Sequence, residues 1–422
     1  MVSGETGREM KWLEMYLKYT EHLESPTIFH QWVALAVAGH VLGRKVWLVR
    51  GGEYCIFPGQ MMVVLVSPSA IARKSTAIEA GVKLIESLPV GMANVLPTKT
   101  SPQQLLQALQ PVDEEGVPIE DADCVGLIVA SELGSFFSAE GFLETMATHV
   151  TALFDAKHGL IDPQTLVPEP RRVKFEFRSW SITLLNPCAG LVGGTTPMGI
   201  AEELPKAARQ AGFLGRVLWI YSHDTDREPN DLTEMMPFNV SKTRAALVDG
   251  LVRMAHKQGP FRFTKQGKGC FSQWYHDVNI PYLKTLDVDI VKESGYFGRR
   301  GDHLLRTAMV LAGMEEDEEL WLREKAIQAA IGMLKTVEKQ LNMSMHQVGV
   351  ARSTEYYERL LYFLSRRKAG ATKRDILRAL WRYGKLTDLD EALQTLTHAG
   401  KVRSTGKLIG LVKSKGSMLK GC

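Results

Sequence analysis

Residues 61–76 read MMVVLVSPSAIARKST, an unbroken apolar run followed by a polar loop that ends in Lys74-Ser75-Thr76. The run 61–66 is short and contains no alternating polar residue, which is the pattern of a strand buried on both faces of a parallel sheet. Helical periodicity follows the loop as far as residue 88. The segment therefore predicts a strand, a loop and a helix in direct succession.

A lysine and a hydroxyl at a strand-to-helix turn are the groups that hold phosphate and Mg²⁺, together with the backbone N–H groups of the helix N-terminus. We interpret the loop as a P-loop for ATP and Mg²⁺, with Ser75 also a metal ligand. Its nucleotide-binding candidates are Ser69, Ala70, Ala72, Arg73, Lys74, Ser75 and Thr76. The usual pattern GxxxxGK[ST] has two glycines, which are absent because Pro68 and Arg73 stand near their places. A residue other than glycine in such a backbone conformation costs about 1 kcal/mol or more.

A second apolar strand, residues 125–130, ends in Ser131-Glu132, and Glu132 lies 58 residues beyond Lys74. We assign Glu132 as the catalytic acid that orients and polarises the attacking water. An aspartate ordinarily precedes this glutamate and holds the Mg²⁺ shell, so Ser131 is the corresponding metal-ligand candidate. The alternative is a surface acid that follows a strand by chance.

Residues 188–197, CAGLVGGTTP, predict a third core strand whose small residues allow close approach to a nucleotide. Thr196, or its neighbour Thr195, is our candidate for a catalytic sensor of the γ-phosphate. Gly-Thr-Thr-Pro is equally suited to a strand-ending turn and helix cap, so both interpretations stay open.

Arginines at two further places are candidates for phosphate contact. Arg216 follows Gly-Phe-Leu-Gly and precedes the strand 217–221, where it could reach the γ-phosphate of a neighbouring subunit. Arg299 and Arg300 begin an apolar helix and could contact the nucleotide of their own subunit. A surface salt bridge is the alternative for Arg216, and a solvated basic helix start is the alternative for the other two.

Strands and helices alternate over about residues 60–222, which predicts an α/β core of parallel strands with flanking helices. We expect four domains: an N-terminal helical collar at 1–58, the core at 59–230, an α-helical lid at 231–347 and a winged helix at 348–422. The last of these shows three helices, at 353–368, 372–380 and 387–398, and then two short strands.

Composition excludes several classes of protein. The chain has 422 residues, of which 45% are hydrophobic and 23% are charged, so it can bury sizeable cores and is not disordered. No run approaches the roughly 18–20 apolar residues of a membrane span, and no signal peptide is visible. Five widely spaced cysteines without a CxxC pair predict a reducing cytoplasm and no sulfur metal site.

Charge is distributed unevenly along the chain. The net charge is +4, yet residues 352–422 carry 16 lysines and arginines against 6 aspartates and glutamates, which leaves the body negative. Such a tail suggests contact with nucleic acid, with a solvated basic face as the alternative. Our DNA-binding candidates are Lys174 and Arg178 on an alternating hairpin at 171–185, and Lys401, Arg403 and Lys407 on the wing. A hairpin packed wholly inside the subunit is the alternative for the first two. The expected recognition helix is acidic, so we expect backbone contact without base readout.

The order of these segments resembles the ATPase domain of phage and mobile-element primase-helicases over about residues 15–312. The resemblance rests on Ser25-Pro26, Phe29-His30, the string LGRKVW at 42–47, Phe57-Pro58 and the glycine-poor RKST at 73–76, together with Ser131-Glu132-Leu133, Gly-Thr-Thr-Pro and the arginine before the last core strand. RKST is a usual variant in that family, although this chain has one residue more between Ser67 and Lys74.

The family is similar to superfamily 3 and MCM-type AAA+ helicases, which form hexameric rings around DNA. The resemblance implies that Lys74 and Ser75 bind phosphate and Mg²⁺, that Glu132 activates water, that Thr196 senses the γ-phosphate and that Arg216 acts in trans.

We therefore expect an ATP-dependent replicative helicase or translocase of a phage or mobile element. It would form a homo-oligomer, a hexamer by resemblance, on single-stranded or forked DNA in the cytoplasm of a bacterial or phage-infected cell, and any primase or loader would be a separate chain. The alternative is a noncatalytic or weakly hydrolysing initiator whose DNA binding is switched by nucleotide. A winged-helix regulator with a vestigial ATPase core is the third possibility.

Overall fold

The computed structural model describes residues 11–51, 54–68, 71–97, 100–137, 143–155, 161–177, 179–202, 212–227, 239–285, 295–365, 367, 370–381, 386–398, 401–405 and 408–411. Four candidate residues, Ser69, Ala70, Arg178 and Lys407, lie outside these ranges. The chain divides into two compact units, residues 1–342 and 343–422. No helix in the part of the chain that the structure describes has the length and apolar character needed to span a membrane.

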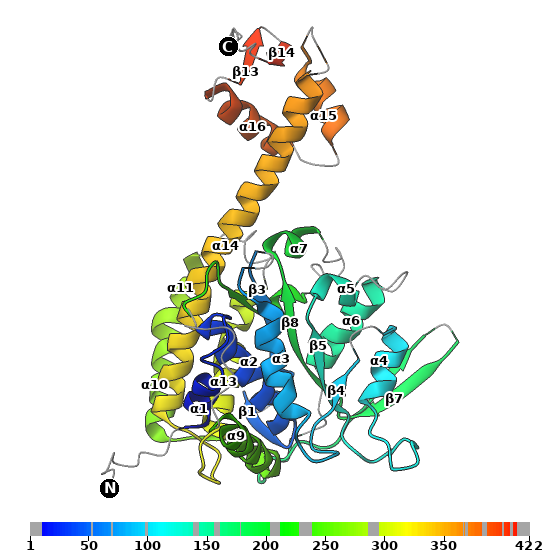
Figure 1. Ribbon diagram of the computed structural model, residues 1–422, viewed down its shortest axis with the longest axis vertical. Coiled ribbons are helices and arrows are strands. Elements are labelled where there is room, and N and C mark those ends of the chain that lie inside the picture. The colour runs from blue at the N-terminus through cyan, green and yellow to red at the C-terminus, as the bar shows by residue number, and fades with distance from the viewer. Residues whose placement is uncertain are drawn as a thin grey trace. The chain divides into compact units, whose positions relative to one another are not determined.

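The centre of the first unit is a sheet of five parallel strands (Figure 1). Their order across the sheet is β4 (Val95–Leu96), β5 (Val125–Ala130), β8 (Cys188–Thr195), β3 (Met62–Val66) and β9 (Leu218–Tyr221). Every residue of β3 and β8 is buried, as their apolar sequences require. The predicted α/β core is therefore confirmed, and β5 has the predicted bounds.

Helices flank this sheet. They are α1 (Trp12–Tyr19), α2 (Thr27–Leu42), α3 (Lys74–Ile85), α4 (Pro102–Leu109), α5 (Leu133–Phe137), α6 (Leu143–Phe154), α7 (Pro197–Glu202) and α9 (Asn239–His256). The α2 helix packs against α3, β3 and β8. An apolar helix without a polar face is stable only when surrounded, and α2 is buried along nearly its whole length. Instead of a separate collar, α1 and α2 belong to the same hydrophobic core as the sheet.

The expected all-helical lid also contains short strands. β10 (Gly259–Pro260) pairs with β1 (Val46–Arg50), which in turn pairs with β2 (Tyr54–Ile56). β11 (Arg262–Phe263) pairs with β12 (Trp321–Leu322). The helices here are α10 (Lys265–Trp274), the π-helix η3 (Tyr275–Asn279), α11 (Ile280–Thr285) and α13 (Tyr296–Gly313). Strands of two residues have too little periodicity to be detected in the sequence.

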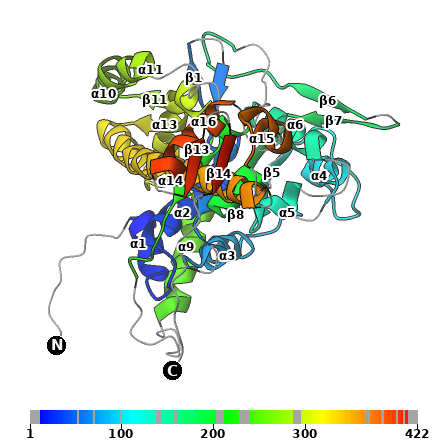
Figure 2. The ribbon, with the colours of Figure 1, turned by 90° about the horizontal axis from the view of Figure 1, so that it is seen from above.

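The predicted hairpin is confirmed as β6 (Arg172–Glu176) and β7 (Ser181–Leu185), an antiparallel pair that extends outward from the parallel sheet (Figure 2). Its side chains alternate between buried and exposed positions on β7. The inward face, with Phe175, Ile182 and Leu184, belongs to the core of the first unit.

The second unit has its own core, formed by apolar residues from the end of α14 (Glu324–Ser365), from α15 (Lys373–Leu380) and α16 (Leu386–His398), and from β13 (Val402–Thr405) and β14 (Leu408–Leu411). The predicted order of helices and strands is confirmed. The predicted break between residues 341 and 353 is wrong, because α14 is continuous for 42 residues. That interval contains no proline, and a single glycine costs only about 1 kcal/mol in a helix.

Candidate nucleotide-binding site

The carboxyl ends of β3, β5 and β8 meet at one edge of the parallel sheet. In the strand register, Val66 of β3 lies beside Thr195, and Ala130 of β5 lies beside Gly193. The amide of Ser67 donates to the carbonyl of Thr195 at 3.4 Å, which continues the pairing to the start of the next loop. The segments that follow these strands therefore leave the sheet side by side, the usual position of a ligand site in an open α/β sheet.

Lys74 is the first residue of α3 and lies at this edge. Its ammonium Nζ donates to the carbonyl oxygen and to the hydroxyl of Ser67, each at 3.0 Å, and to the carbonyl of Pro68 at 3.4 Å. Partial burial lowers the pKa of Lys74. The ammonium thus lies against Ser67 and Pro68, where it can exchange these neutral acceptors for phosphate oxygens, which form stronger, charge-assisted bonds.

Gly194 brings two of the candidate segments together. A Cβ atom at Gly194 would lie 2.8 Å from the carbonyl oxygen of Ser131 and 3.5 Å from Cβ of Lys74. Lys74 on α3 and Ser131 after β5 therefore both lie beside the same glycine of β8, at the place where a side chain would stand. Only a residue without a side chain permits this approach.

Arg73 has the left-handed backbone conformation, with φ 43° and ψ 47°. This is the position of the second glycine in the usual P-loop pattern, and the loop keeps the left-handed conformation although arginine disfavours it by about 1–2 kcal/mol. Two contacts from residues 24–25 surround it. The hydroxyl of Ser25 donates to the carbonyl of Arg73 at 2.9 Å, and Glu24 pairs with Nε of Arg73 at 3.2 Å.

Glu132 is exposed, and its carboxylate accepts a hydrogen bond from the Ser135 hydroxyl at 3.2 Å. The carboxylate can therefore reach water. Ser75 is also exposed, in the first turn of α3. Among the residues that the structure describes, no three His, Cys, Asp or Glu side chains form a metal site. The donors fit Mg²⁺ held mainly by nucleotide phosphates, water and one hydroxyl, as is common for this ion.

Thr196 follows β8, and its hydroxyl accepts a hydrogen bond from the amide of Gly199 at 2.9 Å. With Pro197 next to it, Thr196 thus caps α7, which was the structural alternative. The hydroxyl proton remains able to donate to a phosphate oxygen, so capping does not conflict with a sensor role.

Arg216 lies at the amino end of the parallel strands, opposite to Lys74. It precedes β9, which is parallel to β3, and six residues at about 3.3 Å each give about 20 Å between Arg216 and the carboxyl end of the strands. It is buried, with Nε on one carboxylate oxygen of Asp155 at 2.9 Å, Nη2 on the other, and Nη1 on the carbonyl of Gly212 at 2.8 Å. Arg216 therefore takes no part in the nucleotide site of its own chain.

Arg299 and Arg300 lie near Arg216, at the amino end of the sheet, and not near Lys74. Gly295, just before α13, is so close to Gly215 that a Cβ on Gly215 would come within 2.5 Å of its carbonyl carbon. Burial, and then the charge of Arg216, lowers the pKa of Arg299. Arg300 is buried and donates from Nε and Nη2 to Glu338 at 2.5 and 2.6 Å. The structure does not bring either arginine to the nucleotide of its own subunit, a placement that the linear sequence could not reveal.

The DNA-binding candidates are charged but partly paired. Lys174 pairs with Glu176 on the same strand at 2.7 Å. In the second unit Lys401 and Arg403 are exposed at β13. The acidic α16 helix pairs with Lys373 through Asp390 at 2.6 Å.

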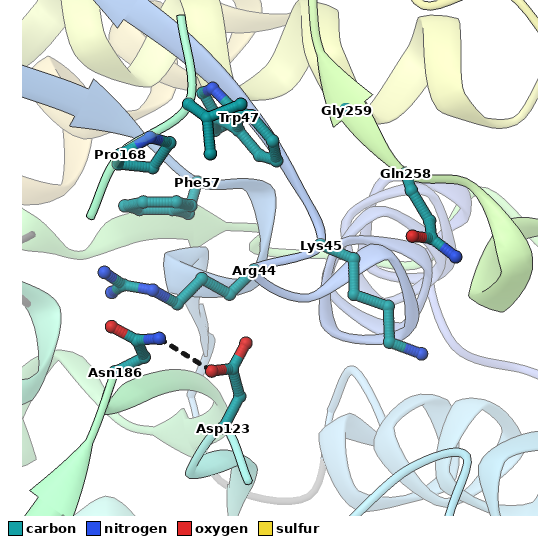
Figure 3. Close-up of a pocket in the computed structure, with 10 residues that line it drawn as sticks. Arg44, Lys45, Trp47, Phe57, Asp123, Pro168, Asn186, Gln258 and Gly259 are labelled. Carbon is teal, nitrogen blue, oxygen red and sulfur yellow. Dashed lines mark hydrogen bonds between the residues drawn. The ribbon is translucent and has the colours of Figure 1, made fainter. Parts of the chain in front are cut away.

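A cavity of about 380 Å³ is lined by residues that precede core strands, among them Phe57, Asp123 and Asn186, and it therefore lies at the amino end of the sheet (Figure 3). Its polar side chains mostly bind one another or the chain. Asn186 donates to Asp123 at 2.7 Å, and Lys45 donates to the carbonyl of Ala255 at 3.2 Å. Arg44 lies over the ring of Phe57, 4.3 Å from its centroid.

Sequence reasoning assigned no role to Ser25, Glu24 or Asp155. Ser25 lies 48 residues before its partner Arg73, and Asp155 lies 61 residues before Arg216. No spacing rule connects positions so far apart. A scan against protein-family models found no match to this chain, and a search of curated proteins also found none.

Proposed function

We propose that this chain is an ATP-hydrolysing P-loop motor of the AAA+ type that translocates on or unwinds DNA as a ring of identical subunits. One observation carries the nucleotide part of this proposal. Lys74, at the start of a helix, and Ser131, beside the exposed Glu132, both lie next to the position that a Cβ atom would take at Gly194, at the carboxyl end of a parallel strand. Such an arrangement would offer a phosphate the N–H groups of a helix start and a cation, with a carboxylate on the residue after Ser131.

In the proposed reaction, Lys74 and the first N–H groups of α3 bind the β- and γ-phosphates of ATP. Mg²⁺, held by the phosphates and Ser75, would neutralise charge that develops on the transferred group. Glu132 accepts a proton from the attacking water, whose oxygen bonds to the γ-phosphorus as the bond to ADP breaks. ATP and water thus give ADP and phosphate.

Two features support the AAA+ assignment. In that fold the sensor strand lies between the P-loop strand and the strand that carries the catalytic acid, which is the place of β8 between β3 and β5. Arg216 is about 20 Å from the nucleotide edge of its own chain, so a catalytic role requires the site of a neighbouring subunit. A ring supplies such a neighbour at every interface.

The DNA part rests on the second unit. Three helices followed by a two-stranded antiparallel pair agree with a winged helix. The exposed Lys401, just before β13, and Arg403 on β13 are suited to phosphate contact, which fixes position on DNA without reading sequence.

The test is ATP hydrolysis with and without single-stranded DNA, and unwinding of a forked duplex. The variants are Lys74→Ala and Glu132→Gln, with Lys83→Ala as control, because Lys83 lies on the same helix α3 and pairs only weakly with Glu79 at the surface. We expect DNA-stimulated turnover in the wild type and the control, and none in the two site variants. Glu132→Gln should still bind ATP. Absence of turnover in a folded, oligomeric wild type would contradict the motor.

A second candidate is a nucleotide switch that binds ATP and hardly hydrolyses it. It is favoured by Ser131, which replaces the usual metal-binding aspartate with a hydroxyl, and by the capture of Arg216 within its own chain. If the protein is a switch, Glu132→Gln should leave its ATP-dependent DNA binding as in the wild type, and neither protein should unwind DNA. If the protein is a motor, the wild type should unwind DNA and Glu132→Gln should bind DNA without unwinding it.

A further inference from the structure

Arg73, the residue before Lys74, has a left-handed backbone conformation that is unfavourable for arginine. Other parts of the fold must therefore stabilise this conformation. The direction of the first turn of α3 depends on this residue. If Arg73 relaxed to an ordinary conformation, Lys74 and the first N–H groups of α3 would turn away from the loop edge.

Ser25 is the residue that holds this conformation from outside the loop. Its side chain is completely buried, and its hydroxyl donates to the carbonyl of Arg73 at 2.9 Å. The same carbonyl accepts the amide of Ala77 at 3.3 Å, the first backbone bond of α3. Ser25 therefore fixes the peptide group at which the loop becomes a helix. The exposed pair between Glu24 and Arg73 adds a weaker contact.

The segment that carries Ser25 is itself fastened to the turn after β9. Asp226 accepts the amide of Thr27 at 2.8 Å, and Nε of Arg227 donates to the Thr27 hydroxyl at 3.1 Å. Thr225 donates to the carbonyl of Glu24. The position of Ser25 is therefore fixed by bonds to residues 225–227 and not by the loop. This independence allows Ser25 to hold the loop in one conformation.

We propose that Ser25 is a positioning residue for nucleotide binding, and that its bond to Arg73 replaces the conformational freedom of the missing glycine. The proposal rests on the proposed function, since it concerns the same site. Ser25 does not approach the reacting atoms. Its loss should therefore weaken the binding of ATP and leave the rate at saturating ATP nearly unchanged.

The test is a double-mutant cycle with Ser25→Ala, Arg73→Gly and the double variant. Binding is measured by titration with a fluorescent ATP analogue, and turnover by KM and kcat. We expect Ser25→Ala to raise the dissociation constant about fivefold, the factor for one hydrogen bond of about 1 kcal/mol. Because glycine adopts the left-handed conformation freely, Ser25→Ala should change the affinity less than twofold in the Arg73→Gly background.

A control separates this role from general stability. Thr307 follows Arg306, which donates to the carbonyl of Phe57 at the start of the sheet, and the buried Thr307 hydroxyl donates to the carbonyl of His303 at 2.8 Å. Thr307→Ala therefore removes a similar bond far from Lys74. It should lower the melting temperature and leave ATP affinity unchanged. Equal loss of affinity on Ser25→Ala in both Arg73 backgrounds would overturn the proposal.

Thermal unfolding without nucleotide keeps the proposal testable apart from the proposed function. Arg73→Gly should make the melting temperature insensitive to Ser25→Ala, whereas additive losses would overturn the inference. If Ser25→Ala does not fold, Ser25→Ala/Arg73→Gly should fold, and failure of both would count against the proposal. A wild type that binds no ATP would refute the proposed function, while the thermal cycle would still decide whether Ser25 holds Arg73.

Discussion

The bond between Arg216 and Asp155 allows a direct test of whether Arg216 acts on a neighbouring subunit. The perturbation is Asp155→Asn, which keeps the shape of the side chain and removes the charge. Breaking a fully buried ion pair costs about 3–5 kcal/mol. Here Arg216 is 8% exposed but Asp155 is 44% exposed, so water screens the pair, and Gly212 still binds one N–H group. We expect a loss of about 1–2 kcal/mol in the free energy of unfolding.

Activity should change in the other direction. An arginine that must leave Asp155 to reach a neighbour's phosphate leaves more easily when the partner is neutral. Turnover should therefore be retained, or should rise by up to about tenfold if this release limits the rate, since 1.36 kcal/mol is a factor of ten. Arg216→Ala should abolish turnover and leave ATP binding intact.

The assays are urea unfolding and steady-state ATP hydrolysis. Asp317→Asn is the matched control, because Asp317 is 43% exposed and pairs with Arg323 away from the site. Mixed rings provide a further check: Arg216→Ala subunits mixed with Lys74→Ala subunits should recover turnover, because some interfaces then contain both native residues. If Asp155→Asn stops turnover as fully as Arg216→Ala does, or if mixing restores nothing, action in trans is refuted.

Three other outcomes follow from the structure. Gly194→Ala should lower ATP affinity and cost about 1–3 kcal/mol of stability, because the new Cβ meets the Ser131 carbonyl at 2.8 Å; Gly269→Ala, in open space, should do neither in the same titration and urea melts. Burial lowers the pKa of His40 to about 4, so folded His40 stays neutral while the unfolded chain takes up a proton below about pH 6.5. The free energy of unfolding should therefore fall as pH drops from about 6.5 to 4. In urea unfolding, His40→Leu should reduce the change of this free energy by about 1.4 kcal/mol per pH unit, and an unchanged pH dependence would contradict the reasoning. Replacing Lys401 and Arg403 together by glutamine should weaken DNA binding and reduce the salt dependence of the logarithm of affinity by about 1.4–1.8, whereas an unchanged dependence would exclude them from phosphate contact.

Local patterns predicted those elements whose side chains share one environment along the whole segment. The run 125–130 became β5 with the same ends, and the alternation at 171–185 became the β6–β7 hairpin. At the start of α4, Ser101 forms a capping box with Gln104, a signal that lies within four residues of sequence. In each case the signal is contained within a few residues, because it reflects burial or hydrogen bonding of that segment alone.

Features that depend on distant partners were not accessible in this way. The sequence of α2 shows that the helix is apolar, but not that β3, β8 and α3 surround it. Arg299 and Arg300 read as a basic helix start near a nucleotide, whereas the packing of Gly215 on Gly295 places them at the other end of the sheet. The left-handed Arg73 was suspected from the missing glycine, and its partner Ser25 was not.

The sequence by itself determined that a buried strand, a lysine-bearing loop and a helix follow one another, because these depend on the burial and dihedral preferences of neighbouring residues. Only the tertiary structure decided which groups meet. Parallel pairing brings the ends of β3, β5 and β8 to one edge and leaves Arg216 at the other. Between two parallel strands the chain must return from the carboxyl end of the sheet to its amino end. Residues far apart in sequence therefore become neighbours at one end, and residues joined by a single strand lie at opposite ends.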